Sequence, residues 1–424
     1  MKHYSFLLIL FMALCLSLGN GNKAQAGSLQ TRGVWVSCFE FEELGLKDKT
    51  EAQFRANANK IFATIRANGC NTVYFHVRAY DDAIYPSSVA GFSKYISSDG
   101  KAPGYDPLKI LVSLAHSHKL KIHAWMNPYR VSSTKILDPA SETTTVRIVN
   151  QVKEIINRYA VDGIHFDDYF YPTNIKKYKK VPAATRRQNV NVMVRKVYQT
   201  VKQKKKSLKF GISPAGDITY CEKIGADVRT WLSQSGYVDY IIPQIYWSNN
   251  YIMSGKKTAL FNERLAKWRE INKRDVPMYV GLALYKTGYS LKEDPGWKKS
   301  SGNIASQIRL IRSGNTEGYV FFAYKDLIRS GAAKELKKYY KAIGKITLNK
   351  KKKTLRAGKK YRLKVSFWPA NLHGKIKWKS SNKKIASVSK KGIVKAKKKG
   401  TVRIYATYGT MKKSCKIIVK KKRK

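Results

Sequence analysis

Short apolar runs and longer amphipathic segments alternate along the chain from residue 30 to about residue 343. The runs predict strands at 33–37, 71–80, 121–129, 161–169, 209–214, 238–247, 278–284 and 318–324. The amphipathic segments predict helices near 51–68, 107–118, 144–159, 184–204, 227–234, 263–273, 304–313 and 332–342. Eight successive strand–helix units favour an α/β fold, a (β/α)8 TIM barrel rather than an open doubly wound sheet.

The two-residue period within each strand predicts which side chains face the lumen of the barrel. In the fourth strand Ile164 and Phe166 should face the helices, which leaves His165 and Asp167 inside. The inward positions of the upper lumen are Arg78, His76, His123, Asn127, His165, Asp167, Ser213, Gln244 and Tyr246. A barrel lumen normally holds Val, Ile and Leu, and burying so many polar groups is unfavourable unless they pair or bind a ligand. The pattern therefore predicts a site at the carboxyl ends of the strands. For the fourth strand alone, an acidic turn in which Asp168 caps the next segment is the alternative.

Aromatic residues also collect at or just beyond the predicted strand ends. They are Trp35, Tyr80, Tyr85, Trp125, Tyr129, Tyr169, Tyr171, Tyr246, Trp247, Tyr285 and Tyr324. Each one alone is more simply explained by core packing, but together with the polar rim they favour a carbohydrate cleft in which rings stack on sugars. No glycine-rich phosphate loop follows any strand, which argues against an enzyme that uses nucleotides.

The last part of the chain has a different pattern. Short alternating segments at 345–349, 361–368, 376–380, 385–389, 393–397, 401–408 and 416–419 predict a small all-β sandwich over residues 344–421, with a hairpin at 388–394. Residues 344–424 contain 26 Lys and 4 Arg but no Asp or Glu, whereas the preceding 343 residues carry 53 basic and 27 acidic side chains. The positive electrostatic field of such a segment attracts polyanions. A generally basic proteome is the alternative explanation for the net charge of +56.

The N-terminus has the order of a secretory signal: Lys2, an apolar run at 6–18, and Ala24-Gln25-Ala26. We expect residues 1–26 to be a signal peptide cleaved after Ala26, and the mature protein to be secreted or associated with the cell wall, with no membrane span. Export makes anionic wall polymers better partners for the basic domain than nucleic acid. The four mature cysteines are scattered, so neither a zinc site nor a disulfide framework is predicted.

A series of motifs resembles the bacterial glycosyl hydrolase-like family 10 barrel over residues 28–343. In chain order these motifs are Arg32-Gly-Val-Trp35, Asn71-Thr-Val-Tyr-Phe75, Asp82-Ala-Ile-Tyr-Pro86, His123-Ala-Trp125, Asn127-Pro-Tyr-Arg130, Asp162-Gly-Ile-His-Phe-Asp-Asp-Tyr169, Gly211-Ile-Ser-Pro214, Pro243-Gln-Ile-Tyr-Trp247 and Gly281-Leu-Ala-Leu-Tyr285. The resemblance implies an exported glycoside hydrolase that cleaves glycan strands of peptidoglycan. The C-terminal segment, with Trp378, Ile385-Ala-Ser-Val388 and Gly400-Thr-Val402, is similar to group 2 bacterial Ig-like domains.

Glycoside hydrolysis normally requires two carboxyl groups that flank the bond. Asp167 is the first candidate by position and phase, and the second is Asp82, slightly favoured, or Asp168. Tyr169 stands where chitinase-type barrels have a glutamate, so their mechanism is not carried over.

The expected substrate-binding residues are Arg78, His76, His123, Trp125, Asn127, Tyr129, Arg130, His165, Tyr169, Ser213, Gln244, Tyr246, Trp247 and Tyr285. No cofactor or metal is implied, and the expected partner is cell-wall polysaccharide. The alternative is a non-catalytic wall-binding protein that holds glycan in the barrel while the basic domain attaches to anionic polymer.

Overall fold

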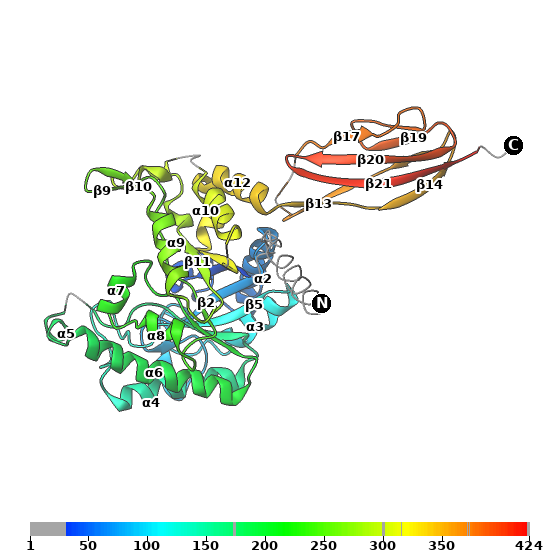
Figure 1. The fold of residues 1–424 in the computed structure, drawn as a ribbon. Coiled ribbons are helices and arrows are strands. Elements are labelled where there is room, and N and C mark those ends of the chain that lie inside the picture. Colours follow the sequence, from blue (N-terminus) through cyan, green and yellow to red (C-terminus); the bar gives the residue numbers. More distant parts are fainter. Residues whose placement is uncertain are drawn as a thin grey trace, which may run out of the picture.

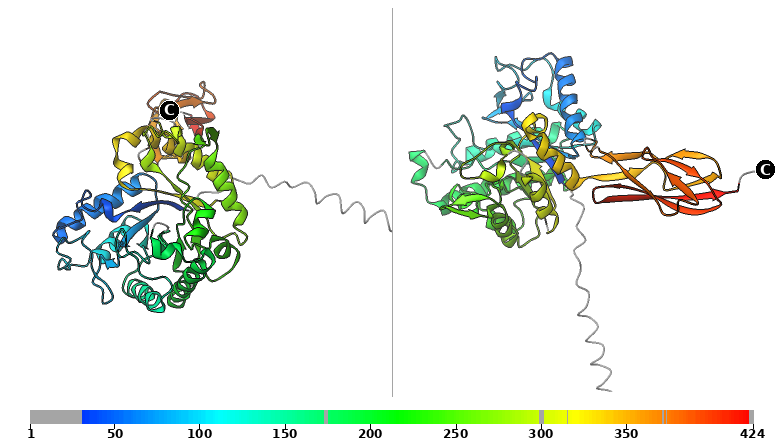
Figure 2. Two further views of the ribbon diagram at one scale, coloured as in Figure 1. Left: turned by 90° about the vertical axis from the view of Figure 1, so that its left-hand side faces the viewer. Right: turned by 90° about the horizontal axis from the view of Figure 1, so that it is seen from above.

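The computed structural model describes residues 31–172, 175–298, 302–314, 316–370, 372 and 374–421, so the expected signal peptide at 1–26 lies outside the described residues. A barrel of strands and helices is followed by an all-β arm that extends from one end of it (Figures 1 and 2). Among the described residues no helix has the length and apolar character needed to cross a membrane. The cysteines within the described part of the chain are unpaired and buried.

Eight parallel strands within the described residues form the central sheet, in the order β11-β12-β1-β2-β5-β6-β7-β8. Their bounds are β1 Thr31–Val36, β2 Thr72–Arg78, β5 Lys121–Met126, β6 Gly163–Phe166, β7 Lys209–Ile212, β8 Tyr240–Ile241, β11 Tyr279–Leu282 and β12 Gly318–Phe321. Parallel bridges from Ile241 to Met278 and from Gln244 to Gly281 join β8 to β11. The expected (β/α)8 barrel is therefore confirmed.

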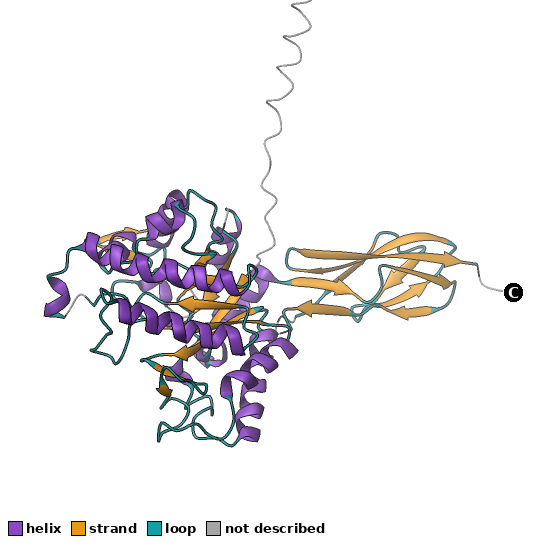
Figure 3. Cartoon of the chain, turned by 90° about the horizontal axis from the view of Figure 1, so that it is seen from below, coloured by secondary structure: helices purple, strands orange, loops and turns teal. Residues whose placement is uncertain are grey.

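Helices surround the barrel, as Figure 3 shows. The longer ones are α2 Glu51–Ala67, α3 Pro107–Ser117, α4 Glu142–Arg158, α6 Ala183–Lys204, α9 Leu260–Ile271, α10 Asn303–Arg312 and α12 Ala333–Ile343. Shorter ones are α5 Lys176–Lys179, α7 Ile218–Lys223, α8 Val228–Ser233 and α11 Lys325–Ile328. Local sequence marks the start of two of these helices: Thr50 and Gln53 form a capping box at α2, and Asp106 caps α3 directly before Pro107.

Two packing regions separate the outward and inward faces of the strands. Val73, Phe75 and Ile164 pack in the large core between strands and helices. Tyr74 and Trp125 belong to a separate cluster inside the lumen, together with Trp35, Tyr240, Ile242 and Val320. This division confirms the alternation predicted from the two-residue period.

The arm is a β-sandwich with its own small apolar core. A four-stranded sheet, β14-β21-β20-β17, consists of Lys352–Arg356, Met411–Lys420, Gly400–Tyr408 and Lys377–Ser380. A three-stranded sheet, β15-β19-β18, consists of Lys360–Arg362, Ile393–Ala396 and Ala386–Val388, and β13 Lys345–Leu348 pairs with β16 Val365–Trp368. The predicted hairpin is the antiparallel pair β18–β19. The pattern missed β14 because this strand lies in a run of lysines with one buried apolar residue, Leu355.

The sandwich packs against the N-terminal end of the barrel, opposite the end where the parallel strands finish. The guanidinium of Arg32, at the start of β1, lies 4.9 Å from the ring centroid of Trp368. The Nε of Arg32 donates to the carbonyl oxygen of Gly69 at 2.8 Å. Leu372, in a loop of the sandwich, is buried in the same apolar cluster as the barrel core. The two domains therefore share an apolar contact rather than only a linker.

Candidate active site

Two adjoining cavities open at the carboxyl ends of the barrel strands. The inner one, of about 180 Å³, is lined by Trp35, Ser37, Phe39, His76, Trp125, Asn127, Arg130, Asp167, Asp168, Tyr169, Ser213, Gln244, Tyr246, Tyr285 and Phe322. The outer one, of about 570 Å³, is lined by Arg130, Ser132, Ser133, Thr134, Ile136, Asp168, Tyr169, Phe170, Tyr171, Pro172, Ile175, Tyr220, Ile224 and Gln244. Arg130, Asp168, Tyr169 and Gln244 line both cavities, so the two form one continuous cleft.

Asp167 lies at the bottom of the inner cavity, directly after β6, and is only 2% exposed. Its Oδ1 accepts a hydrogen bond from the backbone N–H of Tyr169 at 3.2 Å, while Oδ2 is buried without a hydrogen bond of normal length among the described residues. The indole N–H of Trp125 also interacts with this carboxyl. Burial, and then the charge of Asp168, raise the pKa of the Asp167 carboxyl well above its usual range. Burial therefore favours the protonated form of Asp167, which is able to donate a proton into the cavity.

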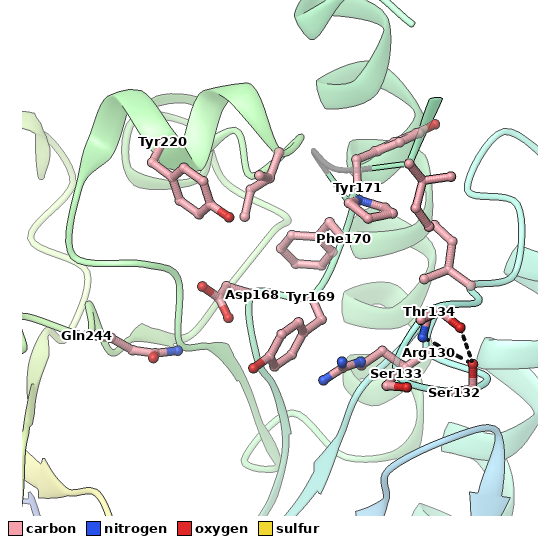
Figure 4. A pocket seen from close by; sticks show the side chains of 14 residues that line it. Arg130, Ser132, Ser133, Thr134, Asp168, Tyr169, Phe170, Tyr171, Tyr220 and Gln244 are labelled. Atoms are coloured by element: carbon pink, nitrogen blue, oxygen red, sulfur yellow. Dashed lines mark hydrogen bonds between the residues drawn. The ribbon is translucent and has the colours of Figure 1, made fainter. Parts of the chain in front are cut away.

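Asp168 lies where the inner and outer cavities meet, between Gln244 and Tyr169 (Figure 4). Burial raises the pKa of its carboxyl to about 6, and the hydrogen bond from Gln244 and the charge of Arg130 act in the opposite direction. Asp168 is therefore largely ionised at neutral pH. Both neighbouring carboxyl groups in this cleft thus have raised pKa values, as groups that exchange protons near neutral pH require.

His76 and Trp125 form one wall of the inner cavity by stacking face to face, with ring centroids 3.8 Å apart and an interplanar angle of 6°. The backbone N–H of Cys38 donates to Nδ1 of His76 at 3.4 Å, so the proton of the neutral ring is on Nε2. Burial lowers the pKa of His76 to about 3 and keeps the ring neutral.

Four polar atoms around this cavity lack a hydrogen bond of normal length in the described part of the chain: Nε2 of His76, Nε1 of Trp125, Oδ1 of Asn127 and Oδ2 of Asp167. They interact as two donor–acceptor pairs, His76 with Asn127 and Trp125 with Asp167. Buried polar atoms are rarely left unpaired, because each one costs about 1–3 kcal/mol. Because neither pair forms a hydrogen bond of normal length, a polar ligand in the cavity can bond to the same atoms. Sugar hydroxyl and acetamido groups both donate and accept, so they match this mixed set.

Arg130 and Tyr169 form the rim between the two cavities. The guanidinium of Arg130 lies 3.9 Å from the centroid of the Tyr169 ring, and Figure 4 shows the two side chains next to each other. Tyr169 is 49% exposed, which is high for an aromatic residue. An exposed ring held by a cation on one face leaves a surface on which a sugar can stack.

Asp82, the slightly favoured second carboxylate, does not line either cavity. Its Oδ1 accepts from the backbone N–H groups of Ala79 and Tyr80 at 2.8 and 3.0 Å. Short aspartate side chains commonly close turns in this way. The choice of Asp82 is therefore corrected: it shapes the turn after β2, and Asp168 is the carboxyl that shares a cavity with Asp167.

His123 and His165 face the lumen but lie below the cleft. The indole N–H of Trp35 donates to Nε2 of His165 at 3.1 Å, and the Tyr240 hydroxyl lies 3.2 Å from Nδ1 of His165 and 2.9 Å from Nδ1 of His123. His123 lines a separate cavity at the opposite end of the barrel. Their assignment to substrate binding is corrected, because side-chain phase gives the face of a strand but not the depth along the lumen.

Three further expected binding residues are also outside the cleft lining. Arg78 is buried and bonds Oε1 of Gln151 and Oδ1 of Asp81, each at 2.8 Å, so its guanidinium is used within the protein. Tyr129 packs edge-on against Phe170 in the core between strands and helices. Trp247 likewise packs against that core. A register shift interrupts β2 between His76 and Arg78, and Tyr129 and Trp247 lie in loops beyond β5 and β8, so the two-residue period does not predict side-chain direction at these positions.

The structure brings together His76, Trp125, Asn127, Arg130, Tyr169, Ser213, Gln244, Tyr246 and Tyr285 around Asp167 and Asp168, as expected. It adds Ser37, Phe39 and Phe322, which the sequence analysis did not select. Ser37 and Phe322 directly follow β1 and β12, so the criterion of strand ends would have found them if small and apolar residues had been included. No group of three His, Cys, Asp or Glu side chains in the described part of the chain is placed to hold a metal ion.

Family models match both domains. The glycosyl hydrolase-like 10 model matches residues 30–146 and 133–299, more than half of the chain. The chain belongs to the glycosyl hydrolase-like 10 family. The group 2 bacterial Ig-like domain model matches residues 342–419, which confirms the second resemblance as well.

Individual relatives are consistent with this assignment. The chain is 30% identical over 360 residues to glycosyl hydrolase YngK from Bacillus subtilis (strain 168), covering 70% of this chain and 69% of the relative. It is 32% identical over 353 residues to glycosyl hydrolase DigH from Escherichia coli (strain K12), covering 66% of this chain and 78% of the relative. The prediction of an enzyme of the glycoside hydrolase class is confirmed at the level of the family.

Solved structures show the same fold at low identity. The glycoside hydrolase domain of PgaB (BpsB) from Bordetella bronchiseptica matches with a TM-score of 0.52 and 11% identity, covering 72% of this chain and 98% of that domain. Catalytic domain 2 of the group II chitinase from Ostrinia furnacalis matches with a TM-score of 0.50 and 10% identity, covering 74% of this chain and 96% of that domain. At such identities the likeness concerns the barrel fold alone.

Proposed function

We propose that the protein is exported and hydrolyses glycosidic bonds in the glycan strands of the bacterial cell wall, with Asp167 as general acid and Asp168 as its ionised partner. The observation that carries the proposal is the pair of carboxyl groups in one cleft, where burial raises the pKa of Asp167 well above its usual range and that of Asp168 to about 6. They are the only carboxyl groups among the described residues that line either cavity.

In this mechanism the proton of Asp167 passes to the oxygen of the leaving sugar as the bond from that oxygen to the anomeric carbon breaks. Positive charge then develops on the sugar ring, and the Asp168 carboxylate stabilises it. Water adds to the anomeric carbon and its proton restores the acid. The neutral His76 and Asn127 side chains line the same cavity and are placed to bind sugar substituents.

A polymeric substrate is supported by the shape of the cleft. Asp168 lies at the junction of two cavities of about 180 and 570 Å³, so sugar units can occupy both sides of the carboxyl pair. Tyr169, Tyr246, Tyr285 and Phe322 supply aromatic faces in the inner cavity. The wall as the location is supported by the signal-like N-terminus and by the wholly basic second domain.

The test is incubation of the full chain with purified peptidoglycan, with and without its stem peptides, followed by mass analysis of released fragments. We expect the wild type to release glycan fragments and the Asp167→Asn variant to bind the same material without releasing any. Asp82→Asn is the matched control, because Asn keeps the Oδ1 acceptor that closes the turn after β2. A wild-type protein that binds glycan but releases no fragment would support the non-catalytic wall-binding alternative.

A further inference from the structure

The outward face of the four-stranded sheet of the sandwich carries an array of cations. The buried side chains Leu355, Ile404, Cys415 and Ile417 identify the inward positions of this sheet, and the intervening positions point outward. Eight of the outward positions on the four strands are Lys or Arg, and all eight are exposed. They are Lys352, Arg356, Lys377, Lys379, Arg403, Lys412, Lys416 and Lys420.

The register places these cations directly beside each other. Lys352 pairs with Lys416 across β14 and β21, and Lys416 pairs with Arg403 across β21 and β20, so three cations form one row across the sheet. Arg356 pairs with Lys420 in a second row. Neighbouring strands are about 4.8 Å apart, and outward residues follow each other about 7 Å along a strand. These spacings are shorter than the screening length of about 8 Å at physiological ionic strength, so the charges reinforce one another.

No acidic side chain relieves this repulsion. Residues 344–424 contain no Asp or Glu, and none of the eight cations forms an ion pair with another described residue. Like charges directly opposite each other destabilise a sheet. The remaining outward positions are small or hydroxyl-bearing, apart from Ile418 and Tyr405, and the ammonium of Lys412 lies 4.5 Å from the centroid of the Tyr405 ring. A flat face of this composition suits an external polyanion.

We propose that this face binds a linear phosphodiester polymer of the cell wall. A phosphodiester remains ionised at all physiological pH values, and a linear chain of phosphates can follow a row such as Lys352–Lys416–Arg403. A membrane surface fits less well, because peripheral attachment also uses protruding apolar residues, and the face has none that are freely exposed. Because the sandwich packs on the N-terminal end of the barrel, the bound polymer leaves the catalytic cleft at the opposite end open.

The opposite sheet supplies a matched control. Its outward face has three cations, Lys360 and Lys395, which pair directly, and Arg362. The face variant Lys352→Gln/Arg403→Gln/Lys416→Gln and the control variant Lys360→Gln/Arg362→Gln/Lys395→Gln each remove two lysines and one arginine. Both lower the net charge by the same amount, so they differ only in which sheet loses its cations.

The experiment measures binding of the full chain and both variants to purified poly(glycerol phosphate) across a series of salt concentrations. We expect the face variant to bind at least about 10-fold more weakly than the wild type. The slope of the logarithm of its binding constant against the logarithm of the salt concentration should become shallower by about two to three, the number of phosphate contacts removed. The control variant should stay within about 2-fold of the wild type. Circular dichroism melting confirms that each variant is folded, and the face variant should melt at the same or a higher temperature because like-charge pairs are relieved.

Equal losses of affinity for poly(glycerol phosphate) in the face variant and the control variant would overturn the proposal, because binding would then depend on net charge alone. Tighter binding to a DNA duplex, to poly-glutamate, or to vesicles of equal parts phosphatidylglycerol and phosphatidylcholine would also overturn it in favour of that class of partner. The choice of a wall polymer rests on the proposed export, but the assay requires no turnover. An inactive enzyme that binds poly(glycerol phosphate), or an active one that does not, therefore separates the failure of one proposal from that of the other.

Discussion

The rings of Trp125 and His76 stack with centroids 3.8 Å apart and planes within 6° of parallel. Each ring has a buried nitrogen without a hydrogen bond of normal length in the described part of the chain, and both residues line the inner cavity beside Asp167. Stacking fixes the two rings before substrate arrives, so no ordering of these side chains is needed on binding. Such preorganised donors are most effective in a site that excludes water.

Trp125→Phe should keep the stack on His76 but remove the indole N–H. We expect kcat/KM to fall about 10-fold, the value of roughly one hydrogen bond to the substrate, with little change in melting temperature. Trp125→Ala should instead lose stability by about 3–5 kcal/mol, because it leaves a cavity in the lumen. Steady-state kinetics and thermal unfolding distinguish the two effects. A Trp125→Phe enzyme with unchanged kcat/KM would show that the indole N–H makes no contact with substrate.

Asp167→Asn should lower kcat by about 10²–10⁴-fold, since the variant cannot donate a proton to the leaving oxygen. Substrate affinity should be retained, because the amide has nearly the same shape. The measurement is fragment release from purified glycan together with sedimentation binding to the same material. Asp82→Asn should remain within about 2-fold of the wild type. If Asp82→Asn were inactive instead, Asp82 and the turn after β2 would take part in catalysis, and the assignment of Asp168 as the partner of Asp167 would be wrong.

The rate should fall as pH drops through about 6, because the Asp168 carboxylate then becomes protonated and loses the charge that stabilises the transition state. The alkaline limb should reflect loss of the proton from Asp167, and it should lie well above the usual pKa of an aspartate because burial raises the pKa of this carboxyl. A profile of kcat/KM against pH tests both limbs. Asp168→Asn should remove the acidic limb along with most of the activity, whereas Tyr169→Phe should leave the limb in place.

Asp168 also links stability to pH. Its pKa is about 6 in the folded protein, above the value of about 3.9 for an unfolded aspartate, so the folded state binds more protons between about pH 4 and 6. The contribution of this group to the free energy of unfolding therefore decreases as pH rises through that window. Denaturant unfolding of wild type and Asp168→Asn should show the variant gaining relative stability from pH 4 to pH 6. A constant difference across the window would contradict the raised pKa.

Gly69 couples the barrel to the sandwich. It has a φ of +80°, and an added Cβ would lie 2.9 Å from the Cβ of Pro369. Gly69→Ala should therefore lower the free energy of unfolding by about 1–2 kcal/mol because of the backbone conformation. The clash with Pro369 of the sandwich should lower it further. Gly236→Ala is the control, since Gly236 has a φ of +89° and open space around its Cβ position.

The comparison is made in the full chain and in a barrel of residues 28–343, which we expect to fold and to cleave soluble glycan fragments by itself. Urea unfolding should show a larger effect of Gly69→Ala in the full chain than in the barrel alone, and equal effects of Gly236→Ala in both. Equal effects of Gly69→Ala in the two proteins would mean that the contact with Pro369 contributes nothing. An insoluble barrel would show instead that burial of Leu372 is required for folding.

The sequence by itself determined the barrel, the sandwich and the faces of the strands. Periodicity is a local property, and the alternation of Val73 and Phe75 with Tyr74 and His76 is read from neighbouring residues alone. The same alternation placed Asp167 inside the barrel, next to a strand end. The excess of lysine in residues 344–424 was likewise a matter of composition.

Only the tertiary structure decided how deep each side chain lies in the lumen, where the side chains of the loops point and which strands pair. His123 has the same inward phase as Asp167, but the register pairs it with Gly163 and so places it below the cleft, where the Tyr240 hydroxyl lies between His123 and His165. Asp82 and Asp168 both follow strands, and backbone N–H groups hold the first in a turn while the second lines the cleft. The rows of cations also depend on the register of β14, β21 and β20, strands that are distant in sequence. Such relations arise from contacts between separate segments, and no local pattern encodes them.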